Sequence, residues 1–145
     1  MRIESIAFSP NPKMSTLNGK ELYLADQLSI YIVADGKHHK WVVPKGFITD
    51  LRSGPDIARL VLPKWGNNSC HCALILLHDY LYCAKPDLPR KSDADDFLVE
   101  GLRWAGHPGW KCSIVRAALK LAGGSRFGKD KIRVWDETKQ EVREL

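Results

Sequence analysis

Hydrophobic and polar positions alternate along the first half of the chain. The segment 28–33 is rich in β-branched and aromatic residues, and the segment 40–44 is again apolar. Between them, Asp35 and Gly36 supply the chemistry of a tight two-residue turn. The pattern therefore predicts an antiparallel β-hairpin.

In the second half the apolar residues recur every three to four positions, which is typical of helices. Ser69 is a candidate N-cap for a helix that continues to residue 82, and Ser92 for a helix that continues to residue 105. A third helix is expected over 110–121. The shorter expected elements are a strand over 46–50, a helix over 56–62 and a last strand over 131–135.

This order of elements predicts an α+β fold, with a small antiparallel N-terminal sheet followed by an antiparallel helical hairpin and a third helix. A chain of 145 residues is expected to form a single domain, 1–145. Its expected parts are a strand-rich segment 1–55, a helical segment 56–124, and a C-terminal strand and tail 125–145.

Composition excludes several classes of protein. No apolar run approaches the roughly 20 residues of a membrane span, and the N-terminus lacks a signal peptide's charged start and long apolar core. Synthesis in the cytoplasm is therefore expected. The net charge of +5 comes from dispersed basic residues without a specific nucleic-acid motif.

The chain has four cysteines, and their spacing matches no common zinc pattern. Two of them flank His71, but residues two apart on a helix point to nearly opposite sides and do not share an ion. Free thiols are expected at Cys70, Cys72, Cys83 and Cys112.

The most informative stretch is the apolar segment 73–82, which contains His78 and Asp79 side by side. Burying an unpaired polar group costs about 1–3 kcal/mol, so both residues need partners. His78 and Tyr82 share one helix face. Asp95 lies in the first turn of the next helix, and a connection of about ten residues lets the two helices pack antiparallel. Asp95 is therefore expected within reach of both rings.

A histidine held by a carboxylate is the basic unit of general-base catalysis. Asp79 points about a quarter turn away from His78, where it could hold a hard cation such as calcium. Asp50 follows a predicted strand and is either a further ligand of that ion or a second partner of His78.

Each of these residues also has a structural interpretation. The pair of His78 and Asp95 could fix the register of two helices, and Asp50 could cap a turn. Asp79 could pair with Arg52 or Arg90. Lysines in this region, including Lys91, are interpreted as surface charges.

The segment His78-Asp79-Tyr80-Leu81-Tyr82 resembles the His-Asp-x-x-Tyr signature of phospholipase A2 enzymes, and Ala94-Asp95-Asp96-Phe97-Leu98 resembles a helix start in their parvovirus relatives. The resemblance implies that His78 is the catalytic base and Asp79 a calcium ligand. It also implies that Asp95 and Tyr82 complete the catalytic set by orienting the base. The glycine-rich calcium loop of those enzymes has no clear copy here.

Three segments together resemble the DUF1353 family, small proteins of unknown function found in tailed phages and prophages. They are 43–53, 77–82, and Arg90 with Ala94-Asp95, within a match over about 41–122. This resemblance implies a phage-type protein made in the host cytoplasm, with the virion as a further destination.

Two functions from different classes are therefore expected. The first is a metal-assisted ester hydrolase that resembles phospholipase A2 and acts on phospholipid membranes, with calcium as its cation. The alternative is a non-catalytic virion protein of the tail or baseplate, or a lysis-cassette accessory protein, in which the cluster is structural and other phage proteins are the partners. A small host-modulating protein is a third class that no residue specifically supports.

Overall fold

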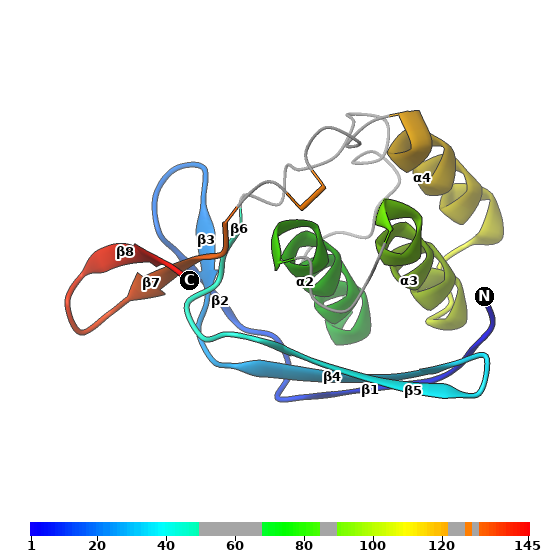
Figure 1. Ribbon diagram of the computed structural model, residues 1–145, viewed down its shortest axis with the longest axis horizontal. Coiled ribbons are helices and arrows are strands. Elements are labelled where there is room, and N and C mark those ends of the chain that lie inside the picture. The colour runs from blue at the N-terminus through cyan, green and yellow to red at the C-terminus, as the bar shows by residue number, and fades with distance from the viewer. Residues whose placement is uncertain (50–67, 85–89, 122–126, 129–130) are drawn as a thin grey trace.

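The computed structural model describes residues 1–49, 68–84, 90–121, 127–128 and 131–145 (Figure 1). The predicted helix over 56–62 lies outside these residues, as does Asp50. The described part combines antiparallel sheets near the N-terminus with helices, so the predicted α+β class is confirmed.

The first sheet contains the predicted hairpin. Its strands are β1 (Ile3–Ser9), β4 (Leu28–Ala34) and β5 (Lys37–Val43), all antiparallel in the order β1-β4-β5. Asp35 and Gly36 join β4 to β5 with φ values of 51° and 74°. Positive φ at both central residues is what a type I′ turn requires, and the sequence Asp-Gly provides it.

A second sheet contains β2 (Met14–Thr16), β3 (Leu22–Leu24) and β6 (Ile48–Thr49) in the order β2-β3-β6. The predicted last strand is β7 (Arg133–Asp136), which pairs with β8 (Glu141–Glu144). The apolar pattern did not predict β8, because all four of its residues are exposed and it has no buried face.

Gly46 links the β7-β8 hairpin to the second sheet through backbone hydrogen bonds. Its amide donates to Leu24 O at 2.7 Å, and its carbonyl accepts from Trp135 N at 2.8 Å. Its φ is +85°, and a Cβ there would collide with the carbonyl oxygen of Trp135. Glycine is therefore required at this position for both conformation and space.

The helices are α2 (Ser69–Ala84), α3 (Lys91–Trp104) and α4 (Gly109–Leu121). Both predicted N-caps are wrong by one or two residues. The side chain of Asn68, not Ser69, accepts the hydrogen bond from the His71 amide at 3.1 Å. Arg90 rather than Ser92 is the N-cap of α3 and makes no side-chain capping bond. Among the described helices, none is long and apolar enough to cross a membrane.

The helices α2 and α3 lie over one face of the β1-β4-β5 sheet, and α4 packs against α3 (Figure 1). Alternate residues of β4 are buried and point toward the helices, where they pack with the buried residues of α2 in one core. At Gly101 a Cβ would lie 2.8 Å from a methyl carbon of Leu74, so α2 and α3 approach closely there. Fully buried core side chains include Leu28, Ile30, Ile32, Leu77, Leu81 and Leu102.

Candidate functional site

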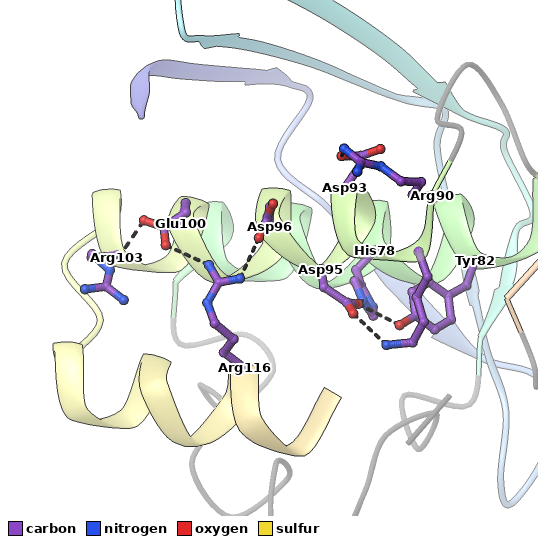
Figure 2. Close-up of polar contacts among 10 residues, drawn as sticks. His78, Tyr82, Arg90, Asp93, Asp95, Asp96, Glu100, Arg103 and Arg116 are labelled. Carbon is purple, nitrogen blue, oxygen red and sulfur yellow. Dashed lines mark hydrogen bonds and ion pairs between the residues drawn. The ribbon is translucent and has the colours of Figure 1, made fainter. Parts of the chain in front are cut away.

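The close contact of α2 with α3 brings His78 and Asp95 together. The Nε2 atom of His78 lies 2.8 Å from Oδ1 of Asp95. The hydroxyl of Tyr82, one turn later on α2, donates to the same oxygen at 2.6 Å. Figure 2 shows the two rings side by side, facing the carboxylate from one helix face. The predicted proximity of the three side chains is therefore present.

A fourth group completes this cluster. The ammonium of Lys91 donates to Oδ2 of Asp95 at 2.7 Å and to the carbonyl oxygen of Leu119 at 2.6 Å. Only 20% of the Lys91 side chain is exposed, so its interpretation as a surface charge is wrong. Lys91 lies four residues before Asp95, on the same helix face, and that spacing was the signal available in the sequence.

The charge state of the cluster follows from its donors. Burial raises the pKa of Asp95, but hydrogen bonds from His78, Lys91 and Tyr82 outweigh this, and the pKa lies below its ordinary value. Burial, with the hydrogen bond to Asp95 and its charge, raises the pKa of Tyr82 far above its ordinary value. Asp95 is therefore a carboxylate and Tyr82 a neutral donor at physiological pH.

An ionised carboxylate only accepts hydrogen bonds, and this fixes the tautomer of the histidine. When neutral, His78 carries its proton on Nε2, next to Asp95, and its Nδ1 atom keeps a lone pair. Within the part of the chain that the structure describes, Nδ1 has no hydrogen-bond partner. Both His78 and Asp95 are only 5% exposed.

Asp79 binds outside this cluster, although its negative charge is close enough to help raise the pKa of Tyr82. Its Oδ2 atom accepts a hydrogen bond from the hydroxyl of Thr49 at 2.5 Å, so it faces β6 while His78 faces α3. Of the two arginines considered as partners, Arg90 pairs with Asp93 instead, at 3.4 Å. The other, Arg52, lies outside the described residues.

The described residues do not form a calcium site by themselves. Calcium takes about six to eight oxygen ligands, usually with several carboxylates among them. No group of three or more His, Cys, Asp or Glu side chains among the described residues could hold a metal ion. Asp50, the second predicted ligand, lies outside them.

Ion pairs next to the cluster hold α4 against α3. The guanidinium of Arg116 on α4 bridges Asp96 and Glu100 on α3 (Figure 2), at 2.5 and 2.7 Å. These contacts dock α4 onto α3. Docking places the carbonyl of Leu119, in the last turn of α4, where Lys91 can reach it.

Comparison with known proteins identifies the family. No curated protein and no solved structure matches the chain. A family model described as a protein of unknown function, DUF1353, matches residues 26–119. The match covers well over half of the chain and contains His78, Tyr82, Lys91 and Asp95. The chain therefore belongs to the DUF1353 family of proteins of unknown function.

Proposed function

We propose that the chain is an ester hydrolase in which His78 acts as the general base. The observation that carries the proposal is the orientation of its ring. Nε2 is bound to an ionised aspartate, and Nδ1 has no partner among the described residues. A histidine held in this way accepts a proton from water at Nδ1, and its carboxylate partner stabilises the imidazolium that results.

The proposed reaction is hydrolysis by direct attack of water. Water attacks the ester carbonyl carbon while Nδ1 of His78 takes one of its protons. The tetrahedral intermediate then collapses, the bond from carbon to the alcohol oxygen breaks, and the imidazolium returns the proton to that oxygen. The products are a carboxylic acid and an alcohol, and His78 regains its starting state.

Asp95 and Tyr82 are positioning residues in this proposal. Asp95 orients the ring and offsets its charge, and Tyr82 and Lys91 hold the carboxylate from both of its oxygens. Phospholipid is the proposed substrate class because the segment 78–82 fits the His-Asp-x-x-Tyr signature of phospholipases A2. Asp79 and Asp50 stay the predicted ligands of a calcium ion.

A non-catalytic role is the second candidate, and burial favours it. His78 and Asp95 are almost fully covered, and three donors occupy the carboxylate. Buried polar clusters of this kind also fix the register of packed helices. In that case the chain is a tail, baseplate or lysis-cassette protein of a phage or prophage, made in the host cytoplasm, with other phage proteins as partners. The resemblance of three segments to small proteins of phages and prophages supports that proposed origin.

Replacement of His78 by Asn separates the two functions. An asparagine amide cannot accept a proton, and Tyr82 and Lys91 still bind the Asp95 carboxylate. We therefore expect the fold to persist and fatty-acid release from phospholipid to fall by about 10²–10⁴-fold. His38, an exposed histidine, provides the matched control. The His38→Asn variant is expected to keep full activity.

The assay is run with added calcium and with a chelator, and each variant is checked by thermal unfolding. An active wild-type protein that loses activity at His78→Asn with its fold intact supports the hydrolase. A wild-type protein without esterase activity under both conditions, together with a His78→Asn variant that unfolds, supports the structural role instead.

A further inference from the structure

Two exposed tryptophans flank the turn between α3 and α4. Trp104, the last residue of α3, is 45% exposed, and Trp110, at the start of α4, is 64% exposed. The other described tryptophans are covered: Trp41 is buried and Trp135 is half-buried. A tryptophan offers roughly 150–250 Å² of surface, so exposing two of them on one turn is unfavourable unless something covers them.

The charges beside these two rings are positive. Arg103 precedes Trp104, and Lys111 follows Trp110 and places its ammonium 5.5 Å from the centre of that ring. The turn itself, 105–108, contains no acidic residue. The acid on the preceding turn of α3, Glu100, is already bound to Arg116 and Arg103. Arg103 shares Glu100 with Arg116, and Lys111 forms no ion pair among the described residues, so the surface combines aromatic rings with a net positive charge.

The turn that carries the rings is well ordered by hydrogen bonds. The amides of Ala105, Gly106 and His107 all donate back to carbonyl oxygens in the last turn of α3, at 2.9–3.1 Å. His107 is itself buried, with 9% of its surface exposed. The backbone that carries the two tryptophans is therefore ordered before anything binds, and little backbone entropy is lost on binding.

We propose that this surface, Arg103, Trp104, Trp110 and Lys111, docks onto an anionic lipid bilayer. Indole rings favour the headgroup layer of a membrane, where their apolar body and their N–H are both accommodated. Lysine and arginine beside them are attracted to anionic headgroups, at about fivefold in affinity for each cation near the surface. Docking of this kind does not require His78 to be catalytic.

Vesicle co-sedimentation tests the proposal with the full chain. The vesicles contain phosphatidylcholine alone, or with about one quarter phosphatidylglycerol, at roughly 50 mM salt. We expect the wild-type protein to bind the anionic vesicles at least tenfold better. The affinity of the double variant Trp104→Ser/Trp110→Ser for the anionic vesicles should be at least tenfold lower. The double variant Arg103→Gln/Lys111→Gln should also bind them more weakly, and its remaining binding should vary less with salt concentration.

Exposed apolar residues elsewhere provide the control. Tyr31→Ser and Val142→Ser alter the outer face of β4 and strand β8, and are expected to bind as the wild type does. Because the substituted side chains are exposed, all variants should fold, which thermal unfolding checks. Equal binding to both kinds of vesicle, or full binding by the double tryptophan variant, overturns the proposal. So does a tryptophan variant that changes only the oligomeric state, since the surface would then be a protein interface.

Discussion

Replacement of Asp95 by asparagine removes the charge at the centre of the cluster while keeping its size. The carboxylate accepts from His78, Tyr82 and Lys91 at 2.8, 2.6 and 2.7 Å. An asparagine carbonyl at the Oδ1 position can still accept from both rings, but its NH₂ group at the Oδ2 position would face the Lys91 ammonium, donor against donor. Removing one partner of a buried pair costs about 3–5 kcal/mol, and we expect the lower end, about 3 kcal/mol at neutral pH.

The dependence of this loss on pH tests its electrostatic origin. The pKa of Asp95 lies below its ordinary value. Its ionised form therefore contributes stability above the unfolded-state pKa of about 3.9, and that stability is lost as the pH falls through the lower folded-state pKa. The difference in unfolding free energy between the wild type and Asp95→Asn should be full at neutral pH and should shrink below about pH 4.

Equilibrium unfolding in urea measures both effects, and Asp93→Asn is the matched control on the same helix. Asp93 pairs at 3.4 Å with Arg90, whose side chain is 74% exposed, so its replacement should cost less than about 1 kcal/mol. A loss at Asp95 no larger than at Asp93 would refute the reasoning. A loss that is equal near pH 3 and at neutral pH would refute it too.

Two further substitutions test the packing that positions the cluster. Gly101→Ala places a methyl 2.8 Å from Leu74. We expect the free energy of unfolding, measured by heat or urea, to fall by about 1–3 kcal/mol despite alanine's higher helix propensity. A more stable variant would show that the helices do not touch there. Arg116→Met removes the ion pair of Asp96 and leaves Glu100 with Arg103 alone. The loss should be about 1–2 kcal/mol at low salt and smaller at high salt, and a loss independent of salt would contradict an ionic contact.

The sequence predicted elements where a periodic apolar pattern met a buried face. β4 and the helices α2 and α3 each have such a face, and the Asp35-Gly36 turn has chemistry that fits only one kind of hairpin. Helix ends were less predictable. Ser69 and Ser92 are good caps by residue type, but the helices begin at Ser69 and Lys91, with Asn68 and Arg90 in the cap positions.

The site was predictable in part for the same reason. The spacing of His78 and Tyr82, with a short connection to Asp95, was enough to bring three side chains together. The contact of Asp79 with Thr49 was not predictable, because Thr49 lies 30 residues away on a two-residue strand that pairs in a separate sheet. Contacts of that kind depend on topology, which local spacing does not encode.

The role of His78 as a general base is tested most directly by one rate comparison. Fatty-acid release from phospholipid vesicles is measured at slightly alkaline pH for folded wild-type protein and folded His78→Asn. We predict measurable release by the wild type and a rate at least about a hundredfold lower for the variant. Equal rates, or no release by the wild-type protein with or without calcium, would contradict that role.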